Sequence, residues 1–354
     1  MNATTSLSDI KFTLVLGGGG LKGLAHVGAL TVLEELNAHP LEVVGSSIGS
    51  LVGACWCAGN DAADLRQLAL QLTKRDLFRV AHRDMALRRM LSPALYRQEP
   101  LMRLITGLFG DMTFDDLERP LIVNTVDLNT GQQVFWGSNG LTHVRVADAV
   151  YASCALPGYL PPIEIEGRYY VDGAAVQNLP VGFARLHRRD LVLAIDVGAS
   201  TVLRSEVHRQ GFAAVYARSI EIAIDTMRSH TLSTWTTPPL VLLRPTVEHI
   251  GLFSFRHNKE LIEEGYRCAQ EGLQDASQLP PPGASGVYPR RRVRVRVDRD
   301  RCIGCGACIV HAPPGTLALD AQGKAQVLQE EQIWSPVDGM YVHQCPTAAI
   351  IARS

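Results

Sequence analysis

Two groups of residues in this sequence have the types and spacing that covalent or metal chemistry requires. Towards the C-terminal end, Cys302, Cys305 and Cys308 are each separated by two residues, and Cys345 follows later, directly before a proline. Three thiolates at this spacing come from one tight loop and can each reach one iron of a cubane cluster, so a fourth ligand must come from elsewhere. Towards the N-terminal end, Ser47 is the central serine of GSSIG, which fits the G-x-S-x-G pattern of an exposed nucleophile.

The four cysteines predict one 4Fe-4S cluster, bound by Cys302, Cys305, Cys308 and Cys345. In proteins with two clusters, the fourth cysteine of each run ligates the other cluster. That position is occupied by Ala312 in this chain, so a second cluster is not expected.

The last segment, 293–354, resembles a single-cluster bacterial-type ferredoxin, and the resemblance implies a small α+β domain. Four thiolates can alternatively bind zinc, but zinc ligands usually come as two separated pairs rather than a triplet and a single Cys-Pro. Disulfides would need an oxidising compartment, whereas we expect a cytoplasmic one. Within the segment, 293–297 should pair as a strand with 350–352, with its valines in the core and its arginines in solvent. We also expect 317–328 to form a hairpin with Gly323 in its turn.

The stretch FTLVLGGGGLKGLAHVGAL is typical of a strand, a glycine-rich turn and a helix. Gly18, Gly20 and Gly23 match G-x-G-x-x-G, the fingerprint of a dinucleotide site. Such a site also needs an acidic residue at the end of the second strand, but this strand ends in GSSIGS and its only carboxylate, Glu42, is at the opposite end. The turn also lacks the Gly-Lys-Ser/Thr of a P-loop, so no nucleotide site is expected here.

GSSIG instead predicts a sharp strand-to-helix turn that holds the Ser47 hydroxyl out of the sheet. The helix that begins near Ile48 directs its free N–H groups toward the serine, which suits a developing negative charge. Because the glycine-rich turn follows another strand, its amides should lie beside Ser47 and form an oxyanion hole. The serine also needs a base, and Asp172, in an Asp-Gly turn after a short apolar run, is a candidate.

Four blocks, GGGGLKG, GSSIG, SCALPGYLPP and DGA, occur in this order along the chain. Together they resemble the patatin-like phospholipases over most of residues 11–275. The resemblance implies a three-layer α/β/α domain with a mainly parallel sheet and a Ser–Asp dyad, in which Ser47 is the nucleophile and Asp172 the base. It implies phospholipid or another acyl ester as the substrate. The implied oxyanion hole consists of backbone amides of Gly18, Gly19, Gly20 and Ile48.

Other assignments of the same residues remain open. In an α/β-hydrolase, His249 or His257 could complete a Ser-Asp-His triad, but the elbow of that fold usually follows several strands, whereas Ser47 follows the second. Asp172 could also do no more than cap its own turn. A second hypothesis is an electron-transfer or redox-sensing protein whose patatin-like domain binds lipid without hydrolysis.

The chain divides unevenly into domains. From Lys11 to Ala276, apolar strand-like runs alternate with helix-like stretches, which is the pattern of an α/β domain with a mainly parallel sheet. The Pro- and Gly-rich segment 277–292 is typical of a linker. We therefore expect an acyl hydrolase domain at 11–276, this linker, and the ferredoxin-like domain at 293–354. The expected strands of the first domain are 12–16, 41–45, 120–128, 190–198 and 240–245.

Composition limits the partners and the compartment. The formal net charge of -1 gives no general attraction to nucleic acid, so nucleic acid is not expected as a partner. No stretch is long and apolar enough to span a bilayer, and the N-terminus shows no export signal, so we expect a cytoplasmic protein. The Arg- and Leu-rich segment 65–98 could be an amphipathic lid or a membrane-docking helix, although a helical layer with a solvated basic face explains it more simply. The remaining cysteines should be small buried residues: Cys55, Cys57, Cys154 and Cys268.

The leading hypothesis is a serine lipid acyl hydrolase with an appended 4Fe-4S cluster. The cluster could regulate access to Ser47, brace the C-terminal domain or pass electrons to a redox partner protein. Hydrolysis itself needs no electrons, which favours a regulatory or structural role. Peripheral contact with a membrane is expected if the substrate is a phospholipid.

Overall fold

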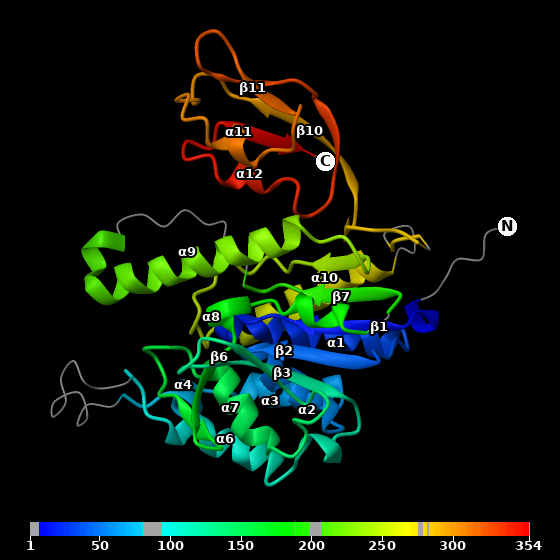
Figure 1. Ribbon diagram of the computed structural model, residues 1–354, viewed down its shortest axis with the longest axis vertical. Coiled ribbons are helices and arrows are strands. Elements are labelled where there is room, and N and C mark those ends of the chain that lie inside the picture. The colour runs from blue at the N-terminus through cyan, green and yellow to red at the C-terminus, as the bar shows by residue number, and fades with distance from the viewer. Residues whose placement is uncertain are drawn as a thin grey trace. The chain divides into compact units, whose positions relative to one another are not determined.

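The computed structural model describes residues 7–80, 94–187, 189–198, 207–274, 279–281 and 283–353. The chain divides into two compact units, whose helices and strands are labelled in Figure 1. The first unit comprises Met1–Arg228 and Leu243–Ala276, and the second comprises Ser229–Leu242 and Ser277–Ser354. Residues 81–93, in the middle of the Arg- and Leu-rich segment, lie outside the described part of the chain.

The first unit is built on a mainly parallel sheet, in which four strands run parallel in the order β3-β2-β1-β7. Antiparallel strands continue the sheet beyond β3: β6 pairs with β3 and then with β5, while β4 also pairs with β3. The central strands are buried along their whole length, which explains why they are near-continuous apolar runs. The strands are β1 (Phe12–Leu16), β2 (Glu42–Ser46), β3 (Leu121–Asp127), β4 (Gln133–Trp136), β5 (Ile163–Ile165), β6 (Arg168–Asp172) and β7 (Leu191–Ile195).

Helices flank this sheet, and α2 is the one that matters most for the site (Figure 1). Every residue of α2 is buried, because the helix is apolar on all sides and packs against β2, β3 and α7. A mainly parallel sheet with flanking helices confirms the predicted fold class. The helices are α1 (Ala25–Glu35), α2 (Ile48–Cys57), α3 (Ala62–Gln71), α4 (Lys74–Leu77), α6 (Glu99–Phe109), α7 (Val146–Cys154), α8 (Ala174–Gln177), α9 (Phe212–Ser233) and α10 (Asn258–Leu273). Short 3-10 helices are η1 (Leu7–Asp9), η2 (Gly20–Leu24), η4 (Phe114–Asp116), η5 (Val181–Arg185) and η6 (Val207–Gln210).

The strand register brings the ends of neighbouring strands together. Leu16, the last residue of β1, pairs with Gly45 of β2 and with Ile195 of β7. The loops that follow β1, β2 and β7 therefore leave the sheet at the same edge. This is the edge at which open α/β sheets usually bind their ligands.

The second unit contains a small antiparallel sheet in the order β13-β10-β14, a two-stranded hairpin and two short helices. The pairing of β10 with β14 is the one predicted from the sequence, and Val295 opposite Ala352 is completely buried while the β10 arginines are exposed. The hairpin is also confirmed, with Gly323 at φ 72° in its turn. The elements are β10 (Arg291–Val297), β11 (Leu317–Leu319), β12 (Ala325–Val327), β13 (Glu331–Trp334), β14 (Ile350–Arg353), α11 (Ala307–His311) and α12 (Met340–His343).

The segment 277–292, for which the sequence predicts a linker, contains some regular structure. Its residues Val287–Tyr288 form β9, which pairs in parallel with β8 (Leu240–Leu243). The expected strand at 240–245 is therefore present as β8.

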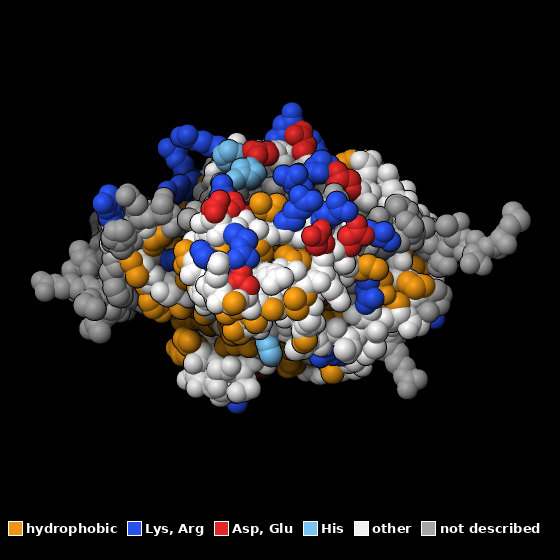
Figure 2. Space-filling view, turned by 90° about the horizontal axis from the view of Figure 1, so that it is seen from above, with side chains coloured by type: hydrophobic (Ala, Val, Ile, Leu, Met, Phe, Trp, Pro, Cys, Tyr) orange, Lys and Arg blue, Asp and Glu red, His pale blue; other side chains and the backbone are white. Residues whose placement is uncertain are grey.

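The surface carries both signs of charge. In the view of Figure 2, Lys and Arg side chains lie beside Asp and Glu side chains, with hydrophobic side chains between them, as expected for a net charge near zero. Among the described residues, no helix combines the length and the apolar character that crossing a bilayer requires.

Candidate active site and cluster site

Ser47 occupies a strained turn between β2 and α2. Its backbone has φ 54° and ψ -129°, a region that residues other than glycine rarely adopt, and α2 begins at the next residue. The turn can approach β1 closely because position 49 is glycine: a Cβ atom there would overlap the carbonyl group of Leu16. The local sequence thus forms the nucleophile elbow that GSSIG predicts.

Two buried side chains hold the backbone of this turn. The amide of Ser47 donates a hydrogen bond to Ser153 Oγ at 2.9 Å, and the Ser153 hydroxyl donates to the carbonyl of Asn124 at 2.7 Å. The hydroxyl of Ser50 donates to the Ser47 carbonyl at 2.6 Å. Ser153, on α7, therefore fixes the elbow to β3.

We expect Ser153→Ala to lower the free energy of unfolding by about 1–3 kcal/mol, because it leaves the Ser47 amide and the Asn124 carbonyl buried without a partner. Urea denaturation followed by circular dichroism measures this change. The matched control is Ser219→Ala, whose exposed hydroxyl donates to Val215 within α9 and whose loss should change stability by less than about 0.5 kcal/mol. Equal stability of both variants would show that Ser153 does not brace the turn.

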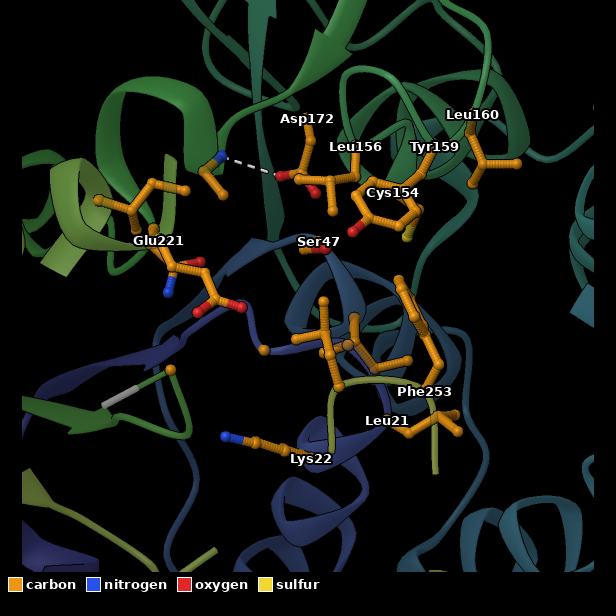
Figure 3. Close-up of a pocket in the computed structure, with 18 of the residues that line it drawn as sticks. Leu21, Lys22, Ser47, Cys154, Leu156, Tyr159, Leu160, Asp172, Glu221 and Phe253 are labelled. Atoms are coloured by element: carbon orange, nitrogen blue, oxygen red, sulfur yellow. Dashed lines mark hydrogen bonds between the residues drawn. The ribbon is translucent and has the colours of Figure 1, made fainter. Parts of the chain in front are cut away.

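Asp172 lies at the end of β6 with its carboxyl group directed toward Ser47 (Figure 3). Its side chain is buried, and Oδ1 accepts a hydrogen bond from the Ala174 amide at 2.8 Å. Oδ2 has no hydrogen-bond partner among the described residues. Burial raises the pKa of Asp172 to about 7, although the Ala174 amide and the nearby Ser47 hydroxyl counteract part of the rise. The structure therefore brings together a serine and a carboxylate with one oxygen available.

The predicted oxyanion hole includes the amide of Gly18, and the structure of the glycine-rich loop contradicts this part of the prediction. The amide of Gly18 donates to the Asn178 carbonyl at 3.0 Å, and the Asn178 side chain donates back to the Gly18 carbonyl at 3.0 Å. Gly18 is therefore not an available donor, and it does not line the pocket. Gly19, Gly20 and Ile48 do line it, and no hydrogen bond within the described part of the chain occupies their amides.

Ser47 lies in an apolar pocket (Figure 3). Asp172 and Cys154 also line this pocket. Two carboxylates on α9, Glu221 and Asp225, also reach the pocket. A wall of this composition can take up an acyl chain while the polar groups contact an ester. Its apolar residues are Leu21, Leu51, Leu77, Phe78, Leu101, Leu156, Tyr159, Leu160, Ile220, Ile224, Leu252 and Phe253.

No histidine in the described part of the chain lines this pocket. His249 and His257 both bind Glu260, at 2.8 and 2.7 Å, and neither lines the pocket. His26 is completely buried beneath the glycine-rich loop, where its Nε2 is 2.8 Å from the Gly17 carbonyl. Burial lowers the pKa of His26 to about 4, so it is neutral and supports the loop. The α/β-hydrolase triad is therefore not formed.

Sequence reasoning assigned no role to two residues that position the site. Ser153 holds the elbow, and Asn178 holds the glycine-rich loop through its carbonyl and its side chain. Both lie in blocks that were already informative, SCALPGYLPP and DGAAVQN. The available signal is a small polar residue that lies in, or a few residues after, a candidate catalytic block.

The four cysteines of the C-terminal segment surround one cavity. Cys302 and Cys308 are buried, Cys345 is half-buried and Cys305 is exposed. Cys302 Sγ accepts a hydrogen bond from the Ala325 amide at 3.4 Å, and Cys345 Sγ accepts one from the Ala349 amide at 3.3 Å. Amide donors to sulfur stabilise thiolate ligands, which fits an iron–sulfur cluster.

The electrostatics at Cys345 point the same way. Burial acts to raise its pKa, but hydrogen bonds from the Thr347 hydroxyl and from backbone amides outweigh burial and keep the pKa below its usual value. Among the described residues, no three His, Cys, Asp or Glu side chains converge closely enough to hold a single metal ion. All eight cysteines are free of disulfides.

Comparison with known families agrees with both sites. Residues 14–185 match the family described as patatin-like phospholipase, and residues 295–352 match the family described as 4Fe-4S single cluster domain. The N-terminal part of the chain is thus similar to the patatin-like phospholipases, and a segment that is similar to 4Fe-4S single cluster domains follows it.

Individual relatives and solved structures share about a third of their residues with this chain or fewer. Lysophospholipase NTE1 of Pyricularia oryzae is 28% identical over 297 residues, covering 75% of this chain and 19% of the relative. Patatin-like phospholipase domain-containing protein 6 of Homo sapiens is 32% identical over 206 residues, covering 54% of this chain and 14% of the relative. Among solved structures, VipD from Legionella pneumophila aligns with a TM-score of 0.44 and 14% identity, over 75% of this chain and 67% of that one. The chain thus spans less than a fifth of the length of these two curated relatives.

Proposed function

We propose that this protein is a serine hydrolase that cleaves the acyl ester of a phospholipid or a related lipid, with Ser47 as nucleophile and Asp172 as base. One observation carries the proposal. A serine in a strained elbow and a buried carboxylate with one unpartnered oxygen share an apolar pocket with unoccupied backbone amides. Each of these features has a separate role in acyl transfer.

The reaction proceeds in two steps. Asp172 Oδ2 takes the proton of the Ser47 hydroxyl as Oγ attacks the ester carbonyl carbon, and it returns this proton to the leaving alcohol. The amides of Gly19, Gly20 and Ile48 donate hydrogen bonds to the oxyanion of the tetrahedral intermediate. Water, activated by the same carboxylate, then attacks the acyl-enzyme and releases the fatty acid. The apolar wall holds the acyl chain and excludes bulk water.

The buried environment of Asp172 changes its pKa in the direction that a general base requires. A carboxylate with an ordinary pKa is a weak base toward an alcohol. Burial raises the pKa of Asp172 to about 7, so the carboxylate is a stronger base and is still ionised in about half of the molecules at neutral pH. The remaining barrier is lowered by the preorganised amides, which are usually the largest single contribution in such sites.

The pH dependence of kcat/KM should report this carboxyl group. Protonated Asp172 cannot accept the serine proton, so activity should fall as the pH drops through about 7 and reach a plateau above it. Initial rates with a soluble ester, measured by pH-stat, give the profile. An inflection near the ordinary aspartate pKa, two or more units lower, would contradict the proposed environment of the base.

Covalent labelling tests the nucleophile directly. A fluorophosphonate probe should add once per chain at Ser47, as shown by intact mass and peptide mapping, and should not label Ser47→Ala. Fatty acid release from a panel of defined phospholipids and lysophospholipids would then identify the substrate. If the wild-type protein neither reacts with the probe nor releases fatty acid from any lipid of the panel, the hydrolase proposal fails and lipid binding without hydrolysis is the better description.

We also propose that the domain at 293–354 binds one 4Fe-4S cluster through its four cysteines, and that 277–292 connects it to the hydrolase domain at 11–276. When bound, such a cluster supplies one-electron redox chemistry. Hydrolysis consumes no electrons, so we assign the cluster a regulatory or structural role, or electron exchange with a redox partner protein. We further propose a cytoplasmic location with peripheral contact at the membrane.

A further inference from the structure

A groove rich in arginine lies beside the acyl pocket. It is formed by α4, by α6 and by residues next to these helices. The structure places four guanidinium groups and two carboxylates around it. The lining residues are Arg75, Asp76, Arg79, Arg97, Glu99, Pro100, Arg103 and Leu104.

The positive charges of the groove are largely uncompensated. Arg75, Arg79 and Arg103 are exposed and form no ion pair within the described part of the chain. The Asp76 carboxylate accepts hydrogen bonds from the amide and hydroxyl of Thr73 at the start of α4. Glu99 is the other carboxylate of the groove. The groove is therefore an excess of positive charge on a chain whose net charge is -1.

The same two helices also form part of the pocket wall. Leu77 and Phe78 line the pocket, and they lie between Arg75 and Arg79 in the sequence. On α6, Leu101 does the same, two residues before an arginine of the groove. The groove and the apolar pocket are thus separated by no more than one helical turn. A surface that binds the arginines therefore lies close to the apolar wall of the Ser47 pocket.

We propose that this groove is a docking site for the phosphate headgroups of an anionic phospholipid bilayer. Guanidinium groups bind phosphate oxygens in a bidentate manner, and exposed cations next to apolar side chains are the combination that holds proteins at anionic interfaces. The apolar neighbours favour a lipid surface over a nucleic acid or an acidic protein, neither of which would fill the pocket. The inference rests on the proposed function, since it names the surface from which the Ser47 pocket takes its substrate.

Vesicle binding tests the docking site. The variant Arg75→Gln/Arg79→Gln/Arg103→Gln should bind mixed phosphatidylcholine–phosphatidylglycerol vesicles roughly 100-fold more weakly than wild type in co-sedimentation, because each cation near such a surface contributes independently. Binding to pure phosphatidylcholine vesicles should be weak for both proteins. The wild-type affinity for mixed vesicles should fall as salt is raised.

A control variant with the same change in net charge distinguishes binding by the groove from attraction by the overall charge of the protein. It replaces cations outside the groove with Gln, at Lys11, Arg185 and Lys259, and should bind mixed vesicles within about threefold of wild type. Equal weakening of both triple variants would overturn the proposal, as would wild-type binding that is the same with and without phosphatidylglycerol. Tighter wild-type binding to an oligonucleotide than to mixed vesicles would overturn it as well. Thermal unfolding confirms that the variants are folded.

The docking site and the hydrolase proposal can fail separately. Ser47→Ala should bind mixed vesicles as tightly as wild type, whether or not the protein hydrolyses lipid. Conversely, the groove variant should lose hydrolysis of mixed vesicles far more than hydrolysis of a soluble ester. If both substrates are affected equally, the groove does not act by docking to the bilayer.

Discussion

Replacing Asp172 with asparagine should lower kcat/KM for ester hydrolysis by roughly 10³–10⁴-fold. The amide of Asp172→Asn cannot accept the proton of Ser47, although its oxygen can still accept the hydrogen bond from the Ala174 amide. The fold should therefore persist while the base is lost. Initial rates with a soluble ester and with phospholipid vesicles measure the effect, and circular dichroism checks the fold.

The same variant has a diagnostic effect on stability. Because burial raises the pKa of folded Asp172 to about 7 from 3.8, the wild-type protein loses stability as the pH rises through 7 and the buried carboxyl ionises. The uncharged Asp172→Asn should lack this loss, so its stability relative to wild type should be higher at pH 8 than at pH 6. Urea denaturation at both pH values tests the sign.

A second aspartate provides the control for activity. Asp148 forms an ion pair with Arg145 on α7 and does not line the pocket. Asp148→Asn should keep kcat/KM within a few-fold of wild type. If the two asparagine variants have similar rates, Asp172 is not the base, whatever the role of Ser47.

Cys345→Ala should remove the cluster from the protein. Three cysteines of one loop cannot ligate all four irons, and Cys345, which lines the same cavity, is the proposed fourth ligand from a distant segment. We expect the anaerobically purified variant to lose most of its iron and its visible absorption. Iron, sulfide and zinc analysis of the whole protein, together with electron paramagnetic resonance after reduction, measures this loss.

Cys268 supplies the matched control, because it is a half-buried cysteine of α10 outside the cluster cavity. Cys268→Ala should retain the full iron content. Zinc at one ion per chain in the wild type, without sulfide, would show that the site is a zinc site. Equal iron in both alanine variants would show that Cys345 is not a ligand.

Much of the fold could be predicted because its signals are local. Each central strand is a short apolar run that is buried on both faces, so the sequence alone marks its position to within about three residues at each end. The elbow at Ser47 and the cysteine triplet are likewise defined within a few residues. The order and direction of the strands then follow from the alternation of strands and helices.

Other features depend on contacts between distant parts of the chain and could not be read from local patterns. The Gly18 amide is occupied because the Asn178 carbonyl, 160 residues away, folds onto the loop. The brace on Ser47 comes from Ser153, 106 residues away. The raised pKa of Asp172 depends on complete burial, which only the packed structure reveals. Local sequence patterns therefore predict the candidate catalytic residues, but they do not predict the distant residues that hold them in place.

The unequal bonding of the two Asp172 oxygens limits how the proton can travel. Oδ1 accepts the hydrogen bond of the Ala174 amide, so in the proposed mechanism a single atom, Oδ2, both collects the proton from Ser47 and delivers it to the departing alcohol. In this mechanism the Ser47 hydroxyl and the leaving alcohol both approach Asp172 on the side of Oδ2. A reversible inhibitor could exploit this asymmetry by placing a neutral N–H or O–H donor against Oδ2 and an alkyl tail along Leu156 and Phe253.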